Sequence, residues 1–270
     1  MKNLIFMQDI DTGRKAESGG NAGLSHIHGR TWSKEVSPYK YSIASWKNWA
    51  EKNNCDVLVM KDLLCETNEM GIAWQRYYLF DMLENQKANI YDQVLLVDAD
   101  TIIHPNCPNF FEMTGHKYAG IHQEGSIDWV GRSMEQYSRF VFDGYIIPYE
   151  NYMNCGFQIF NKSHKKFHKK IIEFYLDNKE IINEVQHKFG IGSDQTPFNF
   201  LLRQNNINFQ FLPYEFNMTA LYQKEILDEE LTFTKLGWIY HYCSIPDNWD
   251  NNKAKYWMKK TYEHFYGELK

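Results

Sequence analysis

Val94-Leu95-Leu96-Val97-Asp98-Ala99-Asp100 is the stretch of the chain that predicts most about its fold. Four consecutive apolar residues suit a strand that is covered on both faces, as in a mostly parallel sheet. Ligands of open α/β sheets bind beyond the carboxyl ends of the strands, where Asp98 and Asp100 are expected. Two carboxylates there can hold Mg²⁺ or Mn²⁺ and leave coordination positions for water and phosphates. The alternative is a solvated acidic turn that caps a helix.

The composition predicts a globular chain with a large core. The chain has 270 residues, 43% of them apolar and 16% aromatic, which suits one large α/β domain and is compatible with stacking on sugars or bases. A net charge of −5 argues against nucleic acid as a general partner. Five widely spaced cysteines without a Cys-x-x-Cys pair predict free thiols in a reducing compartment.

The sequence gives no sign of a membrane span or a leader. The longest apolar run is too short to cross a bilayer, and the apolar run at the N-terminus is too short for a signal peptide. We therefore expect a cytoplasmic protein, either soluble or in weak peripheral contact with an anionic membrane. Two groups of lysines stand out: Lys162, Lys165, Lys166, Lys169, Lys170 and Lys253, Lys255, Lys259, Lys260. The second group, interleaved with Tyr256, Trp257 and Met258, allows that contact, although a solvated helix face is the favoured interpretation.

Apolar strands and amphipathic helices alternate along the chain, which predicts a mixed, mostly parallel sheet flanked by helices. The strands are expected over residues 4–8, 56–60, 94–97, 118–122, 156–160, 207–212 and 237–242. The helices are expected over residues 39–53, 72–85, 163–178 and 194–204. Residues 11–37 are polar and rich in glycine, so they are expected to be either disordered or a functional loop that orders when ligand binds.

Asn154-Cys155-Gly156 opens one of the expected strands. A glycine at a strand start lets the backbone approach a ligand closely. The Asn154 amide can both donate to and accept from sugar hydroxyls. A turn in front of an ordinary core strand is the alternative.

Asp194 and Gln195 lie at the start of an expected helix, with Ser193 as its N-cap and Pro197 in its first turn. A carboxylate and a carboxamide in a first turn can face a sugar ring. Alternatively, Asp194 only complements the helix dipole.

His241 ends the late apolar strand, much as Asp98 follows the earlier one. A neutral imidazole at that place can complete a metal site with two carboxylates. The other interpretation is a hydrogen-bonded core histidine.

The order and spacing of these motifs resemble the GT-A glycosyltransferases, most closely the glycogenin- and galactosyltransferase-like family 8, over roughly residues 1–250. The resemblance implies a Rossmann-like GT-A domain with a nucleotide-binding half over about 1–122 and an acceptor-binding half over about 123–250. A C-terminal helical extension would follow over residues 251–270. The implied activity is metal-dependent transfer of a hexose from a nucleotide sugar, for which a UDP-linked donor is expected, to a glycan, glycolipid or protein.

The resemblance also implies roles for individual residues. In the family, both aspartates and the late histidine hold Mn²⁺ (or Mg²⁺), so the metal ligands would be Asp98, Asp100 and His241. Gln8 and Asp9 lie where the family binds the base. The residues expected to bind the donor are Gln8, Asp9, Arg76, Asp98, Ala99, Asp100, Asn154 and Gly156.

Asp194 and Gln195 match the pair beside the anomeric carbon, which makes them the expected catalytic residues. If the enzyme inverts configuration, Asp194 deprotonates the acceptor hydroxyl. If it retains configuration, which we favour, one of the two supports the donor face while the leaving phosphate takes the proton. The segment 122–152 is the expected acceptor side, where aromatic residues such as Trp129 either stack on sugars or pack in the fold.

The late motif departs from the family pattern. The family has His, then Gly, then Lys-Pro-Trp, whereas His241 is followed by Ser244, Pro246, Asp247 and Trp249. The missing lysine normally bonds the diphosphate. Its substitutes would be Arg76, Lys253 or a residue of the 11–37 loop.

Two other classes share such a scaffold. A nucleotidyltransferase that makes a nucleotide sugar has similar acidic metal ligands, and Gly13-Arg14-Lys15 is faintly similar to its phosphate loop. A glycan-binding protein without catalysis is the second alternative. Intact Asp98, Asp100 and His241 argue against it.

Overall fold

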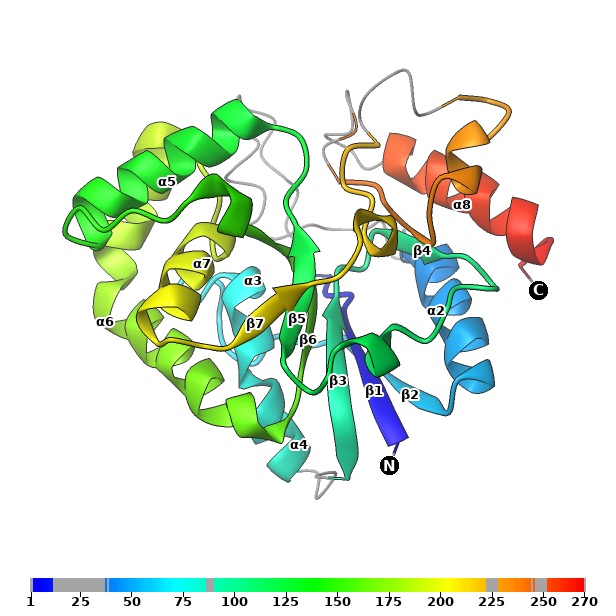
Figure 1. Cartoon of the computed structure of the whole chain (residues 1–270), viewed down its shortest axis with the longest axis horizontal. Coiled ribbons are helices and arrows are strands. Elements are labelled where there is room, and N and C mark those ends of the chain that lie inside the picture. The colour runs from blue at the N-terminus through cyan, green and yellow to red at the C-terminus, as the bar shows by residue number, and fades with distance from the viewer. Residues whose placement is uncertain are drawn as a thin grey trace.

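A six-stranded sheet forms the centre of the protein (Figure 1). The computed structural model describes residues 2–11, 37, 39–85, 90–221, 228–243, 245 and 252–269. In the order β2-β1-β3-β6-β5-β7, only β6 runs antiparallel to its neighbours, and the other three pairings are parallel. The strands are β1 (Lys2–Gln8), β2 (Cys55–Met60), β3 (Tyr91–Val97), β5 (Tyr118–His122), β6 (Met153–Phe160) and β7 (Phe209–Phe211). The predicted mixed, mostly parallel sheet is confirmed.

Helices cover both faces of the sheet, as Figure 1 shows. Helices α2 (Lys40–Lys52) and α8 (Asn252–Tyr266) contribute to the core on one face. The core on the other face is formed with α3 (Ile72–Gln75), α4 (Leu79–Asn85), α5 (Ile127–Val141), α6 (Lys165–Phe189) and α7 (Gln195–Gln204). Short 3-10 helices are η1 (Arg76–Tyr78), η2 (Phe110–Met113), η3 (Tyr149–Asn151), η4 (Lys162–His164), η5 (Tyr214–Phe216) and η6 (Thr232–Lys235).

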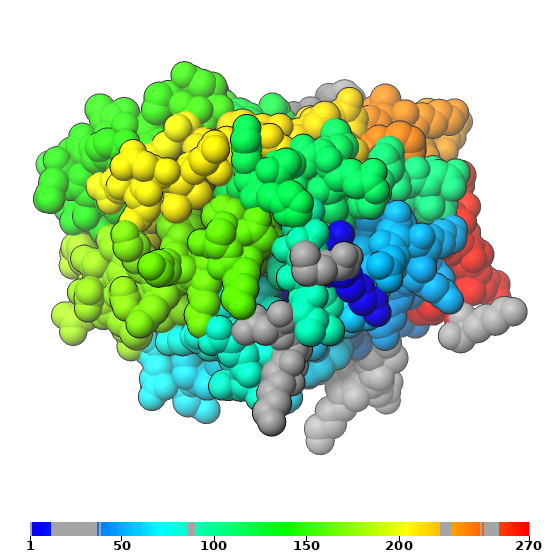
Figure 2. All heavy atoms as spheres, turned by 60° about the horizontal axis from the view of Figure 1, so that its bottom comes forward, coloured from blue at the N-terminus to red at the C-terminus, as the bar shows by residue number. Residues whose placement is uncertain are grey.

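The alternation of side chains along β1 explains the two cores. Ile5 packs into the cluster with α2, whereas Leu4 and Phe6 pack into the cluster with α3–α7. Successive residues of a strand point to opposite faces, so an entirely apolar strand needs cover on both sides. Figure 2 shows the face at which the chain begins, where residues of β1 (dark blue) reach the surface beside the lighter blue atoms of the segment that follows.

A second sheet, of two strands, lies beyond the end of β3. Strand β4 (Thr101–Ile103) pairs antiparallel with β8 (Ile239–His241), and Thr101 lies opposite His241. The indole Nε1 of Trp46 donates to Thr101 Oγ1 at 2.9 Å, which ties this sheet to α2. The pairing therefore brings the late strand beside the acidic motif.

The structure differs from the expected elements in a few places. The helix expected over 72–85 is interrupted by η1, and α6 continues to Phe189. The sequence analysis missed β4, which has three residues, and α5, whose N-cap Ser126 is left-handed and makes no side-chain capping bond. Ser193 was also wrong as the N-cap of α7, because Asp194 occupies that position.

The remaining expectations on the fold concern loops, thiols and surfaces. Residues 12–36 of the proposed 11–37 loop, and Ser244, Pro246, Asp247 and Trp249, lie outside the described residues. All five cysteines are free, as expected. In the described ranges, no helix is long and apolar enough to cross a membrane.

Several lysines of the two basic groups contact polar or acidic side chains. Lys165 pairs with Glu84 at 2.5 Å, and Lys260 pairs with Glu229. Lys170 donates to Asn205 Oδ1 at 2.6 Å. Contact of the second group with a membrane stays a prediction.

Buried His168 predicts a loss of stability in acid. Burial lowers the pKa of this α6 histidine to about 3, against about 6.5 in the unfolded chain. Between these values the unfolded state binds a proton that the folded state does not, so the free energy of unfolding falls as pH decreases below 6.5. The slope for one such group is at most about 1.4 kcal/mol per pH unit.

We expect His168→Gln to flatten this dependence in urea unfolding between pH 6.5 and 4.5. His187→Gln, at an exposed position of the same helix, is the matched control and should keep the wild-type slope. An unchanged slope in the His168 variant would contradict this account of the buried imidazole.

Candidate functional site

Backbone hydrogen bonds fix the acidic motif between two strands. Asp98 N donates to Gly156 O of β6 at 3.0 Å. Tyr242 N donates to Asp100 O at 2.8 Å, directly after β8. Because Thr101 also pairs with His241, the backbone brings Asp98, Asp100 and His241 close together.

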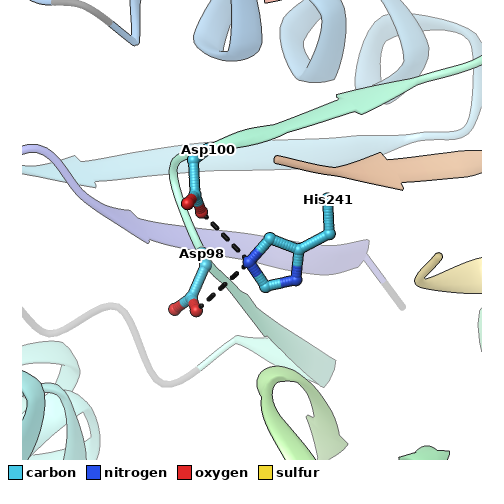
Figure 3. A group of neighbouring side chains, drawn as sticks. All are labelled: Asp98, Asp100 and His241. Carbon is cyan, nitrogen blue, oxygen red and sulfur yellow. Dashed lines mark ion pairs between the residues drawn. The ribbon is translucent and has the colours of Figure 1, made fainter. Parts of the chain in front are cut away.

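The three side chains converge on one point (Figure 3). His241 Nε2 lies 3.1 Å from Asp100 Oδ1 and 3.7 Å from Asp98 Oδ2. One ligand atom from each of the three residues falls within 4.8 Å of the others. His241 is 2% exposed, and its Nε2 makes no geometrically acceptable hydrogen bond within the described part of the chain. A buried imidazole nitrogen that faces two carboxylates suits a divalent cation such as Mn²⁺.

The environment of His241 favours a positive charge at this point. Burial by itself lowers the pKa of His241, but the neighbouring Cys243 and Asp100 raise it by more, so the pKa lies well above its ordinary value. A bound cation can take the place of that proton, because only the deprotonated nitrogen is a ligand. Cation affinity at this site should therefore weaken as pH falls.

Arg76 connects the acidic motif with the start of α7. Its Nη1 donates to Asp98 Oδ1 at 2.9 Å, and its Nε and Nη2 donate to Asp194 Oδ2 at 3.0 and 2.5 Å. Tyr77 OH donates to the same oxygen of Asp194 at 3.1 Å. Burial opposes the charge of Arg76, but Asp194 and Asp98 hold its pKa above the ordinary range.

The charged side chains around His241 Nε2 carry more negative than positive charge. Asp98, Asp100 and Asp194 bring three negative charges, and Arg76 brings one positive charge. With His241 neutral, two negative charges are left, which is the charge that one divalent cation neutralises. The donor set and its charge therefore both fit such an ion.

Gln195 is held by a network of amide groups. Its Oε1 accepts from Cys155 N at 3.0 Å, and its Nε2 donates to Gln123 Oε1 at 3.2 Å. The same oxygen of Gln123 accepts from Asn154 Nδ2 at 2.6 Å. The network fixes the carboxamides that sequence analysis places near a sugar.

Gly156 leaves the space in which the three side chains meet. A Cβ atom at this position would lie 2.6 Å from Asp98 Oδ2 and 2.6 Å from His241 Cε1. Both atoms belong to buried or hydrogen-bonded side chains, so neither could move away without disturbing the site. The glycine is thus required for the close approach of β6 to the acidic motif.

A cleft of about 570 Å³ opens over these side chains. The sequence-predicted site residues that line it are Gln8, Arg76, Asp98, Ala99, Asp100, Asn154, Gly156, Asp194, Gln195 and His241. Asp9 is not among the described lining residues. Its carboxylate accepts from Ser37 Oγ at 2.6 Å and pairs with Lys61, because it points away from the face that Gln8 and Ile10 present.

Sequence analysis missed several residues of the site. Gln123 and Arg132 line the cleft, and Asn217 lies behind it against His241. Gln123 directly follows the expected strand over 118–122, as Asp98 follows its own strand, so a strand-end position was the signal available for it, whereas Asn217 stands at no expected strand end. Arg132 contacts Asp128 on α5, with 3.8 Å between Nη2 and Oδ2. In the sequence, the charged residues near Trp129 are a weak indication of a binding surface.

Comparison with solved structures shows what kind of fold surrounds this cleft. No protein-family model and no curated protein matches the sequence. The fold is similar to a glycosyltransferase involved in the glycosylation of the major capsid of PBCV-1, with 11% identity, a TM-score of 0.58 and coverage of 96% of this chain and 98% of the other. The glycosyltransferase GlyE of Streptococcus pneumoniae TIGR4 is 16% identical, with a TM-score of 0.46 over 97% of this chain and 61% of that one. The protein has a glycosyltransferase fold, as its sequence predicts.

The space at Gly156 gives a direct prediction. We expect Gly156→Ala to weaken binding of Mn²⁺, measured with UDP by electron paramagnetic resonance, by roughly 10- to 100-fold, as when groups that orient metal ligands are disturbed. Gly131→Ala on the exposed face of α5, where a Cβ meets nothing within 4 Å, is the control and should bind Mn²⁺ normally. Normal Mn²⁺ binding by a folded Gly156→Ala protein would contradict the proposed position of the ion.

Proposed function

We propose that the protein is a metal-dependent glycosyltransferase that moves a hexose from a nucleotide sugar, UDP-linked, to a glycan, glycolipid or protein acceptor. The observation that carries this proposal is the convergence of Asp98, Asp100 and His241 at the carboxyl end of β3, inside a glycosyltransferase fold. The resemblance of the motifs to family 8 belongs to the same proposal.

Asp98, Asp100 and His241 would hold the cation, Mn²⁺ or Mg²⁺. When bound, the cation neutralises the charge that develops on the leaving diphosphate. The imidazole nitrogen favours Mn²⁺ over Mg²⁺, since Mg²⁺ prefers oxygen ligands. Arg76 keeps one oxygen of Asp98 occupied, which leaves Oδ2 as the oxygen nearer His241.

The nucleoside would lie on the side of the cleft formed by β1 and α3. Gln8 lines this side with apolar neighbours, and its Nε2 donates to Ile72 O at 3.1 Å, so its Oε1 is the atom available to a base. Ala99 lies between the two metal ligands, where its backbone can meet the ribose. Asp9 is left out of this site because Ser37 and Lys61 already hold its carboxylate. The apolar part of this wall is formed by Phe6, Ile10, Tyr39, Ile72 and Ala73.

The diphosphate needs a positive partner in place of the missing family lysine. Arg76 donates through Nε, Nη1 and Nη2 to protein oxygens, so it acts mainly by holding Asp98 and Asp194. The charge of the cation is then the principal attraction for the diphosphate in the described part of the cleft.

The contacts of Asp194 favour a retaining reaction. A general base must accept a proton in the transition state. Asp194 Oδ2 already accepts from Arg76 Nε and Nη2 and from Tyr77 OH, and Asp194 Oδ1 accepts from Ser193 Oγ at 3.2 Å, so both carboxylate oxygens are engaged within the protein. Asp194 and Gln195 therefore stay as fixed polar groups beside the donor sugar, and the leaving phosphate takes the acceptor proton.

The acceptor would enter past α5. Trp129 lies on the first turn of this helix and lines the cleft together with Asp128 and Arg132. A Cβ at Gly192 would lie 2.6 Å from the Trp129 ring, so the glycine allows the indole to cross the loop before Asp194. An indole face at a cleft rim can stack on a sugar, with charged neighbours available to hydroxyl groups.

The test is a screen of nucleotide sugars for Mn²⁺-dependent hydrolysis and transfer. Asp100→Asn should lower the rate by at least about 100-fold, because loss of one charged ligand weakens stabilisation of the leaving group. The rate should fall as pH decreases, since a proton on His241 competes with the cation.

Asp62→Asn, an exposed carboxylate outside the cleft, is the matched control and should leave the rate unchanged. Full activity in EDTA would overturn the proposed role of the cation. Release of pyrophosphate from a nucleoside triphosphate would instead identify a nucleotidyltransferase.

A further inference from the structure

The orientation of two buried amides can be traced from one backbone group. Gly156 N donates to Asn154 Oδ1 at 2.8 Å. A backbone N–H is only a donor, so the Asn154 atom that faces it is the oxygen. The other end of the amide, Nδ2, accordingly lies 2.6 Å from Gln123 Oε1.

The same oxygen fixes the orientation of Asn217. Asn154 Oδ1 also accepts from Asn217 Nδ2 at 2.9 Å, so the amide oxygen of Asn217 points the other way. This oxygen lies 3.1 Å from His241 Nδ1. Because an amide oxygen is only an acceptor, Nδ1 carries a hydrogen and donates it to Asn217. In neutral His241, the lone pair is therefore on Nε2, the nitrogen that faces Asp98 and Asp100.

Burial and backbone pairing support this contact. Asn217 is 0% exposed and His241 is 2% exposed, so water cannot replace the bond between them. The neighbouring Met218 donates from N to Ile239 O at 2.9 Å and accepts from His241 N at 3.2 Å. These backbone bonds place Asn217 beside the end of β8 independently of its side-chain contacts.

We infer that Asn217 is a positioning residue that selects the Nδ1–H tautomer of His241 and aims its Nε2 at the cation. The inference rests on the proposed function, since the cation belongs to that proposal. Groups that orient a ligating histidine in this way typically contribute 10- to 100-fold to metal affinity, roughly the effect expected here. Asn217 is not among the described residues that line the cleft, and its contact with the candidate metal ligands is the one to His241 Nδ1, so its effect would pass through the imidazole.

Two variants separate positioning from structural support. Asn217→Leu removes both hydrogen bonds, and we expect roughly 10- to 100-fold weaker Mn²⁺ binding, measured by electron paramagnetic resonance in the presence of UDP. Asn217→Asp keeps an oxygen that accepts from His241 Nδ1, and we expect Mn²⁺ affinity within about threefold of wild type, because carboxylates also orient ligating histidines. Its second oxygen meets Asn154 Oδ1, so its thermal midpoint should fall.

Thr219→Val is the matched control. Thr219 lies two residues after Asn217, and its buried hydroxyl donates to Glu124 O at 3.3 Å but does not contact His241. The variant should therefore lower the thermal midpoint without changing Mn²⁺ affinity. If Asn217 positions His241, Mn²⁺ affinity should be lost only in the variant without an acceptor for His241 Nδ1, and it should not correlate with the thermal midpoint.

The outcomes distinguish the inference from the proposed function. Wild-type Mn²⁺ affinity in Asn217→Leu, or equal losses in both Asn217 variants, overturns the role of Asn217 and leaves the cation site standing. Absence of Mn²⁺ binding by the wild-type protein in the presence of UDP overturns the cation site itself.

Discussion

The ion pairs of Arg76 are the interaction on which the rest of the site depends. One buried guanidinium joins Asp98, which follows β3, to Asp194, the N-cap of α7. Arg76 is 6% exposed and Asp194 is 3% exposed, so water stabilises their charges little and each carboxylate–guanidinium contact matters to the other partner. The ends of two elements far apart in the chain are thereby held at a fixed separation. Asp98 in turn presents its second oxygen toward His241.

The architecture of the sheet explains why a cation suits this place. Crossing from β3 into β4 carries two carboxylates past the end of the sheet, and the pairing of β4 with β8 returns an imidazole to them. Arg76 neutralises only part of the negative charge. The negative charge that remains would be neutralised by a bound divalent ion. The same ion would bind His241 Nε2, a buried nitrogen without a hydrogen bond in the described ranges, and would in turn attract a nucleotide diphosphate.

The sequence was sufficient for features that depend on local pattern. The apolar run before Asp98 predicts a doubly covered strand, and the strand-end positions of Asp98 and His241 predict their meeting at one edge. Asp9, directly after β1, contacts Ser37 and Lys61 and is not among the described lining residues, because neighbouring side chains of an extended segment point to opposite faces. Asn217 was beyond reach, since its importance arises from tertiary contacts with Asn154 and His241. Helix α5 was not predicted because no side-chain capping bond marks its start at Ser126.

The position of the cation tests the account most directly. Anomalous X-ray scattering at the manganese edge, from crystals grown with Mn²⁺ and UDP, locates the ion independently of activity. We predict one strong peak within coordination distance of carboxylate oxygens of Asp98 and Asp100 and of Nε2 of His241, with the UDP diphosphate on its open side. Bound UDP with no manganese peak at these three residues would contradict the account.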